Sequence, residues 1–170
     1  MSKFAILGPE STGKTVLAEA LSKYLNAQLV PEYAREYLTH FNRPYTVNDL
    51  ENITAKQIEL MSTLLKKNEQ IIFDTELINL QVWFELKFEF SPLYLNKAIQ
   101  SLRPDFYLLT YPDIEWHSDP LRENQFNREH LFDLYKEKLC HYSFDYGIVK
   151  GKGEERLNSA IKQIENFAGL

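Results

Sequence analysis

The sequence is poor in the residues that cross-link or interrupt a chain: it has one cysteine, Cys140, with 6 glycines and 7 prolines among 170 residues. A lone cysteine permits no internal disulfide and no cysteine-based zinc site, and we interpret Cys140 as a small apolar residue on a helix. Scarce glycine and proline exclude collagen-like and low-complexity chains. No apolar run reaches the roughly 18 residues of a membrane-spanning helix, and no signal peptide is recognisable. We therefore expect a cytoplasmic protein with no membrane partner.

Basic residues are also in the minority, with 19 Lys and Arg against 24 Asp and Glu and a net charge of −5. Nucleic-acid-binding proteins usually carry a basic surface, so we expect no nucleic-acid partner. The 4 histidines lack the spacing of paired metal ligands on one helix face, and we interpret them as structural or surface residues. A hydrophobic fraction of 44% and a length of 170 residues suit one folded domain, residues 1–170.

Short apolar stretches alternate with segments of helical periodicity along the chain. The apolar stretches predict strands at residues 4–7, 28–31, 70–74, 106–110 and 145–149. The helical periodicity predicts helices at residues 16–25, 34–41, 47–68, 77–90, 93–102, 128–141 and 154–167. Such alternation is typical of βαβ units, so we predict an α/β protein whose parallel sheet is covered by helices on both faces.

The strongest motif is the segment GPESTGKT at residues 8–15, which matches the phosphate-binding pattern G-x-x-x-x-G-K-[ST]. Its glycines permit tight turns, its amide groups and the following helix N-terminus attract an anion, and its lysine and last hydroxyl serve the phosphates and Mg²⁺. The motif follows a predicted strand and opens a predicted helix, which favours a phosphate loop over an ordinary strand-to-helix turn. The predicted ATP-binding residues of this loop are Gly8, Glu10, Ser11, Thr12, Gly13, Lys14 and Thr15.

A second ligand for Mg²⁺ is expected at the end of another strand. Asp74 closes the apolar run at residues 71–73, and the carboxyl ends of parallel strands are where ligands bind. With Thr15 it is expected to hold the metal, and it is also a candidate for a catalytic and substrate-binding role. The alternative is that Asp74 caps the helix that begins near Leu77.

The rest of the sequence favours a small-molecule kinase over a GTPase. The D-x-x-G and N/T-K-x-D motifs of GTPases are absent, and 170 residues suit a compact kinase. The block PEYAREY at residues 31–37 lies beyond the predicted second strand, on the side where ligands bind. Here Glu32 can accept a hydroxyl proton, and Tyr33 and Arg35 can contact a substrate. The alternative is a capped helix start in which Arg35 makes a surface ion pair.

Two later segments are further candidates for the site. The polar stretch at residues 113–122 predicts a lid, with Arg122 as the arginine that stabilises the transferring phosphoryl group and Arg128 as the second choice; the alternative is a surface loop. Gly151 and Lys152 follow the last predicted strand, where the backbone can pass close to the flat base of ATP. The alternative there is a plain turn before a helix.

Two features of the helical insertions are open to more than one interpretation. Gln57 lies on the long helix between the second and third strands, where it can contact an amide or a base edge or lie on a solvated face. The aromatic residues between positions 83 and 94 are interpreted as core and as a protomer interface, with substrate stacking by one of them as the alternative. A homo-oligomer is accordingly an expectation.

Together, the blocks GPESTGKT, PEYAREY, IIFDTE, DIEWHSDPLR and GKGEER resemble, in this order and over essentially the whole chain, the nicotinamide riboside kinase domain of the bacterial NadR proteins. The resemblance implies a three-layer P-loop fold of the NMP-kinase type, with five parallel strands in the order 2-3-1-4-5 and a lid. It implies ATP and Mg²⁺ as cofactors, transfer to the 5′-hydroxyl of nicotinamide riboside, and NMN as product. NadR proteins also carry an adenylyltransferase domain, so a stand-alone kinase module is expected here.

The resemblance also implies roles by position. Lys14 and Thr15 serve the triphosphate and the metal, Asp74 serves catalysis or the metal, and Arg122 is the lid arginine. Glu32 and the nearby arginine of the PEYAR block lie at the nucleoside site.

The PEYAR block further resembles the P-E-P-x-A-R segment of deoxyribonucleoside kinases, whose glutamate acts as a base toward the 5′-hydroxyl. Glu32 is therefore the expected general base, with Asp74 as the alternative. Pro31 stands where NadR relatives carry a tryptophan, and Tyr33 can supply an aromatic ring instead. The alternative functions are a kinase for another nucleoside, a deoxynucleoside or a small alcohol, and a regulatory module that binds ATP and hydrolyses it slowly or not at all.

Overall fold

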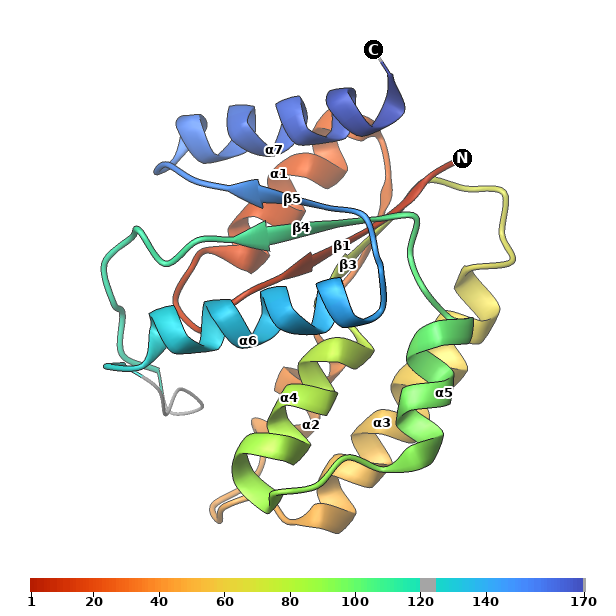
Figure 1. Ribbon diagram of the computed structural model, residues 1–170, viewed down its shortest axis with the longest axis vertical. Coiled ribbons are helices and arrows are strands. Elements are labelled where there is room, and N and C mark those ends of the chain that lie inside the picture. Colours follow the sequence, from red (N-terminus) through yellow and green to blue (C-terminus); the bar gives the residue numbers. More distant parts are fainter. Residues whose placement is uncertain (120–124, 170) are drawn as a thin grey trace.

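The computed structural model describes residues 1–119 and 125–169 of the chain. A parallel sheet of 5 strands lies at its centre, in the order β2-β3-β1-β4-β5, with helices on both faces (Figure 1). The expected three-layer architecture and strand order are confirmed. The strands are β1 (Lys3–Leu7), β2 (Gln28–Val30), β3 (Ile71–Asp74), β4 (Phe106–Thr110) and β5 (Tyr146–Val149).

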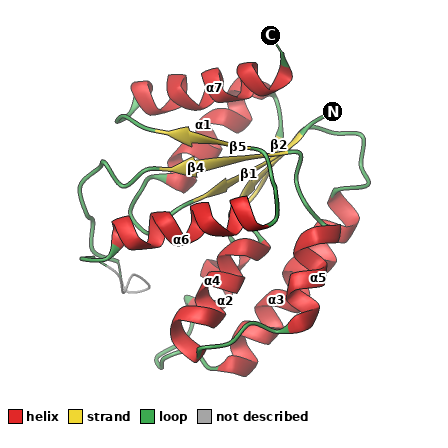
Figure 2. Cartoon of the chain, viewed as in Figure 1, coloured by secondary structure: helices red, strands yellow, loops and turns green. Residues whose placement is uncertain are grey.

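The helices lie in two layers, one on each face of the sheet. Their bounds are α1 (Lys14–Leu25), α2 (Tyr33–Leu38), α3 (Val47–Leu64), α4 (Leu77–Phe88), α5 (Leu93–Ser101), α6 (Arg128–His141) and α7 (Glu154–Ala168). Figure 2 shows α1 and α7 together on one face and α6 on the other, with α2 to α5 extending away from that second face. Among the described residues, no helix combines the length and the apolar composition needed to cross a membrane.

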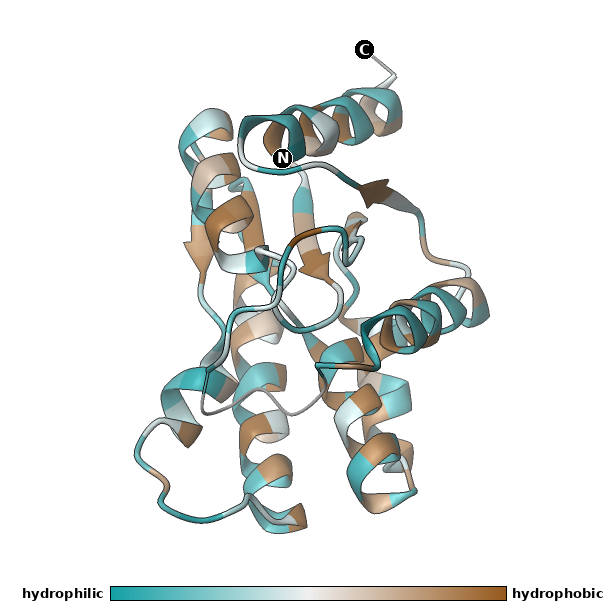
Figure 3. Ribbon diagram, turned by 90° about the vertical axis from the view of Figure 1, so that its left-hand side faces the viewer, coloured by the Kyte–Doolittle hydropathy of each residue, from teal (hydrophilic) through white to brown (hydrophobic). Residues whose placement is uncertain are grey.

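The core has one part on each face of the sheet because successive strand residues point to opposite sides. In β1, Phe4 and Ile6 belong to the cluster under α1 and α7, whereas Ala5 and Leu7 belong to the larger cluster on the opposite face. The central strands are therefore buried on both sides, which explains their continuous apolar runs. Figure 3 shows these strands as apolar ribbon between helices that carry mixed polar and apolar stripes.

Some helix ends differ from the sequence prediction. The helix expected at residues 47–68 ends at Leu64, because residues 66–69 are exposed and add no apolar contact to the core. The helix expected to run to residue 90 ends at Phe88, where Glu89 turns into the left-handed region with φ 61°. The interpretation of Asp74 as the cap of α4 is wrong: the Glu76 carboxylate accepts from the Ile78 amide at 2.9 Å.

The surface interpretations of single residues are mostly confirmed. All four histidines are exposed, at positions 40, 117, 130 and 141. Cys140 lies on α6 as expected, but it is exposed, with its Sγ 3.7 Å from the Tyr146 hydroxyl. The lone cysteine is therefore a surface residue of its helix.

Candidate active site

The phosphate loop connects β1 to α1 at the carboxyl end of the sheet. Gly8 has a φ of 139°, and a Cβ there would lie 2.3 Å from the Thr110 side chain and 2.7 Å from its carbonyl oxygen. Gly13 is the N-cap of α1 with a φ of 73°, and it supplies no side-chain cap. The motif glycines are thus required by close packing on β4 and by a left-handed turn. The first turn of α1 faces the loop as an anion-binding helix terminus.

Polar contacts fix the shape of the loop. The Thr12 hydroxyl donates to the Pro9 carbonyl oxygen at 2.8 Å and lies 2.7 Å from the Thr110 hydroxyl. The Lys14 ammonium group folds back over the loop and donates to the carbonyl oxygens of Gly8 and Pro9 at 2.9 and 2.8 Å. The cationic group is therefore held at the mouth of the loop, where a phosphate would bind.

Thr15 and Asp74 form the second part of the site. Pairing of β1 with β3 sets Ile6 opposite Asp74, and the Thr15 hydroxyl donates to the Asp74 carboxylate at 2.6 Å. Asp74 is 3% exposed, and its Oδ1 has no hydrogen-bond partner among the described residues. Burial is the main reason that the pKa of Asp74 is raised, and the hydrogen bond from Thr15 opposes it.

This pair fits a Mg²⁺ ion. Mg²⁺ is usually held by one or two protein oxygens together with phosphate oxygens and water, rather than by a cage of side chains. The buried, unpaired Asp74 oxygen and the adjacent Thr15 hydroxyl are such oxygens. Within residues 1–119 and 125–169, no cluster of three His, Cys, Asp or Glu residues could hold a metal alone.

Glu32 and Arg35 lie beyond β2, as the sequence predicted. The Glu32 side chain is 17% exposed, and Glu32 stands at the start of α2 as its N-cap residue, although its side chain makes no cap bond. Burial is the main cause that raises the pKa of Glu32, while the Lys14 charge lowers it. Arg35 lies 3.8 Å from the Glu32 carboxylate and donates to Asp119 at 2.9 Å.

A cavity of about 150 Å³ joins these groups. One wall is the phosphate loop, and the others come from α2, α4 and α6. Its lining residues outside the loop are Glu32, Arg35, Leu38, Asn79, Val82, Trp83, Leu86, Leu131 and Tyr135. Arg35 and Trp83 also line an adjoining cavity of about 660 Å³ that extends toward Tyr45 and Lys87. An anionic group bound at the loop would therefore have a compartment lined by both apolar and charged side chains beside it.

Two predicted substrate contacts are not brought to this cavity. Tyr33 packs toward Tyr37, with ring centroids 6.1 Å apart, and belongs to the residues packed against the core. Gln57 is 6% exposed on α3 and does not line the cavity, so the interpretation as a solvated face is wrong. Trp83 instead provides an aromatic wall and stacks on Tyr45 at 5.8 Å.

The segment after β4 contacts the phosphate loop, as a lid would. The His117 amide donates to the Ser11 hydroxyl at 2.8 Å, and that hydroxyl donates to the Glu115 carbonyl oxygen at 3.3 Å. Arg128 donates to the carbonyl oxygens of Ser11 and Ile114 at 3.1 and 2.9 Å. Arg128 therefore ties the segment after β4 to the phosphate loop, while Arg122, the predicted lid arginine, lies outside the described residues.

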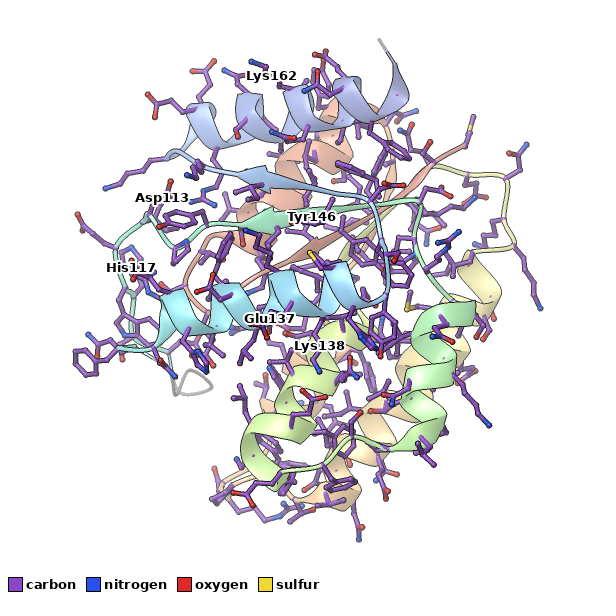
Figure 4. The ribbon with its side chains drawn as sticks, viewed as in Figure 1. Asp113, His117, Glu137, Lys138, Tyr146 and Lys162 are labelled. Atoms are coloured by element: carbon purple, nitrogen blue, oxygen red, sulfur yellow. The ribbon has the colours of Figure 1, made fainter. Side chains whose placement is uncertain are left out.

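The loop after β5 is anchored beside the same segment. The Gly151 amide donates to Asp113 at 2.8 Å, and Arg156 bonds to Asp113 and to the carbonyl oxygens of Gly151 and Tyr111. Figure 4 shows Asp113 and His117 on this one segment at the carboxyl end of the sheet. Lys152 lies 3.9 Å from Glu115. Gly151 and Lys152 thus border the segment after β4 and do not line the cavity at the phosphate loop. Their contact with the base of ATP stays a prediction.

Sequence reasoning missed Asn79 and Tyr135. Asn79 is a polar residue inside the apolar run of α4, and that break in the pattern was its one available signal. Tyr135 had no such signal, because an aromatic residue on an amphipathic helix is ordinary core material. Asp113 and Arg156 were missed as a pair, since they are 43 residues apart in the chain.

Comparison with known proteins agrees with this fold. The family model described as an AAA domain matches residues 3–156. The structure superposes on that of a NadR protein in complex with NR, with a TM-score of 0.84, 24% identity and coverage of 99% of this chain and 52% of that one. A NadR complex with NAD and AMP-PNP gives a TM-score of 0.77 at 23% identity, covering 99% of this chain and 50% of that one.

A deoxyadenosine kinase from M. mycoides with products bound is also similar, with a TM-score of 0.67, 15% identity and coverage of 96% of this chain and 99% of that one. The chain thus spans about half the length of the two NadR chains and nearly all of the deoxyadenosine kinase. At these identities the similarity establishes the fold, and the resemblance to the NadR proteins noted in the sequence is confirmed at that level.

Proposed function

The chain belongs to the AAA domain family, and from that premise we propose that it is an ATP- and Mg²⁺-dependent kinase that phosphorylates the 5′-hydroxyl of a nucleoside. We propose nicotinamide riboside as the acceptor and NMN as the product. One arrangement carries the proposal: Lys14, Thr15 and Glu32 line a single cavity with an apolar wall, and Asp74 accepts the hydrogen bond of Thr15. A phosphoryl donor and a hydroxyl acceptor would meet there.

The phosphoryl transfer follows from these positions. Glu32 takes the proton of the 5′-hydroxyl, whose oxygen attacks the γ-phosphorus of ATP while the bond to the β–γ bridging oxygen breaks and ADP leaves. The Lys14 ammonium binds the β- and γ-phosphates and balances the charge that develops on them. When bound by Thr15 and Asp74, Mg²⁺ would supply further neutralisation of the phosphate charge. Arg122 is the candidate lid arginine.

The assignment of Glu32 as base and Asp74 as metal ligand rests on their surroundings. Asp74 is engaged by Thr15 and lies at the end of a central strand, next to the phosphate loop. Glu32 has no hydrogen-bonded cap role and lines the cavity in which an acceptor would lie. Desolvation raises its pKa, which makes it a stronger base than an exposed glutamate.

The choice of nicotinamide riboside is supported by the chemistry of the cavity and by the similar fold of a NadR protein whose structure contains NR. Trp83 and Leu86 offer a flat apolar surface for a ring, and Glu32 and Arg35 offer an acceptor and a donor for sugar hydroxyls. Pro31 is exposed and lies outside this cavity, so an aromatic surface is supplied from α4 rather than from that position.

The proposal is tested by measuring ADP release from Mg²⁺-ATP with separate acceptors: nicotinamide riboside, the common ribonucleosides, the deoxyribonucleosides and no acceptor. We expect the largest kcat/KM with nicotinamide riboside. A larger value with another nucleoside would keep the kinase and replace its acceptor. ADP release that no acceptor stimulates, with ATP still bound, would refute the kinase and favour a nucleotide-binding regulatory module.

A further inference from the structure

The cavity wall contributed by α4 contains one polar side chain among apolar ones. Asn79 is 4% exposed and lines the cavity together with Val82, Trp83 and Leu86 of the same helix. A carboxamide in such a position loses its hydration and must find hydrogen bonds elsewhere. Its presence in this apolar wall therefore calls for a partner.

Half of that requirement is met by α6. The Tyr135 hydroxyl donates to Asn79 Oδ1 at 2.5 Å, and Tyr135 itself is 3% exposed and lines the cavity. Burial raises the pKa of Tyr135, so its hydroxyl keeps its proton and donates. This bond fixes Asn79 Oδ1 toward α6, and because the amide group is planar it also fixes the direction of its NH₂ group.

The Nδ2 group of Asn79 makes no hydrogen bond with the described residues. Among the described residues, the side-chain polar atoms that are both unpaired and fully enclosed are Asp74 Oδ1, Glu76 Oε2, the Tyr107 hydroxyl and Arg156 Nη1. Asn79 Nδ2 is not one of them, so it is unpaired but not fully enclosed. A buried donor that is neither paired nor sealed, on a residue that lines the cavity, can donate into that cavity. The amide is thus preorganised to bind an acceptor atom of a ligand.

We propose that Asn79 is a specificity-determining residue for the acceptor, donating from Nδ2 to an oxygen of the bound nucleoside, and that Tyr135 is the positioning residue that prevents the amide from turning over. This inference rests on the proposed nucleoside kinase function. The oxygen is a hydrogen-bond acceptor and comes either from a ribose hydroxyl or from a carbonyl on the ring, such as a carboxamide. Nucleosides that lack it bind more weakly.

The test is Tyr135→Phe, which removes the hydroxyl and keeps the ring in the core. With nicotinamide riboside, we expect KM for the nucleoside to rise roughly tenfold, because one oriented hydrogen bond is lost, while kcat and KM for ATP stay within about twofold. Asn79→Leu, which removes the amide altogether, raises the same KM by at least as much. Thermal unfolding of each variant shows whether the fold is retained.

Tyr142→Phe is the matched control. Tyr142 follows α6, and its hydroxyl bonds Gln81 of the same helix α4, but neither residue lines the cavity. Tyr135→Phe and Tyr142→Phe each remove a tyrosine hydroxyl that bonds a side chain of α4. Tyr142→Phe therefore reports any general loosening of the contact with α4. We expect it to leave the nucleoside KM unchanged; an equal rise in Tyr142→Phe and Tyr135→Phe would overturn the inference.

Two analogues identify the oxygen: 2′-deoxy nicotinamide riboside and the pyridine riboside that lacks the carboxamide. The analogue without the contacted oxygen should have a raised KM in the wild type and should gain no further penalty in Asn79→Leu. If both variants bind nicotinamide riboside as the wild type does, the inference is refuted while the kinase stands. If the wild type phosphorylates no nucleoside, the proposed function itself fails, and this inference with it.

Discussion

Replacement of Arg156 by methionine should destabilise the protein and weaken ATP binding together. Arg156 is 4% exposed and holds the loops that follow β4 and β5, through bonds to Asp113 and to the carbonyl oxygens of Gly151 and Tyr111 at 2.9 and 3.1 Å. Methionine fills similar space but donates no hydrogen bond. The variant therefore removes the connection between the two loops without opening a large cavity.

The size of the effect follows from what is left behind. Removing one member of a buried ion pair typically costs about 3–5 kcal/mol of unfolding free energy. The Asp113 side chain is 28% exposed, so water can hydrate the stranded carboxylate. We therefore expect the lower end, about 3 kcal/mol, or a fall in Tm of roughly 6–12 °C for a chain of this length.

Urea unfolding of the wild type, Arg156→Met, Asp113→Asn and the double variant gives the coupling between the two residues. Asp113→Asn is the milder control, because an asparagine oxygen can still accept from the Gly151 amide. A loss below about 1 kcal/mol for Arg156→Met, or a coupling energy near zero, would contradict the role assigned to the pair. An ATP KM that is unchanged in a folded Arg156→Met protein would separate these loops from the ATP site.

Three further predictions concern the site itself. Glu32→Gln should lower kcat about 10²–10⁴-fold. In the wild type, the raised pKa of Glu32 keeps the base protonated to a higher pH than an ordinary glutamate, so kcat/KM should rise with pH through that pKa. A pH profile of kcat/KM that is already flat above pH 4.5 would contradict this. Asp74→Asn and Thr15→Ala should each raise the Mg²⁺ concentration needed for half-maximal activity, as a titration at fixed ATP would show, with unchanged Mg²⁺ dependence in both as the contrary result. Gly8→Ala places a Cβ against Thr110 and should destabilise the chain by about 1–3 kcal/mol in urea unfolding, whereas wild-type stability would contradict the observed packing.

The fold was largely predictable because its elements have strong local patterns. The apolar strands and the phosphate-loop motif identify themselves within a few residues, and each lies where the sequence placed it. The strand order came from the family resemblance, since periodicity alone does not say which strands pair. Helix ends such as that of α3 were less predictable, because they depend on where contact with the core stops.

Site residues that belong to a recognisable sequence motif were predictable, whereas residues identified only by a contact with a residue far along the chain were not. Thr15 and Asp74 lie at the ends of recognisable elements, and the structure brings them within 2.6 Å. Asn79 and Tyr135 are 56 residues apart and meet only because α4 and α6 pack together. Burial of Gln57 was likewise undecidable, because whether a helix face is solvated depends on what packs against it.

The most direct measurement is identification of the products that the protein forms from Mg²⁺-ATP and nicotinamide riboside. The nucleotides are separated and identified by mass spectrometry, with Lys14→Ala as the control that lacks the cation of the phosphate loop. The account predicts NMN and ADP in equal amounts from the wild type and neither above background from Lys14→Ala. ADP accompanied by free phosphate, with no phosphorylated nucleoside, would contradict it.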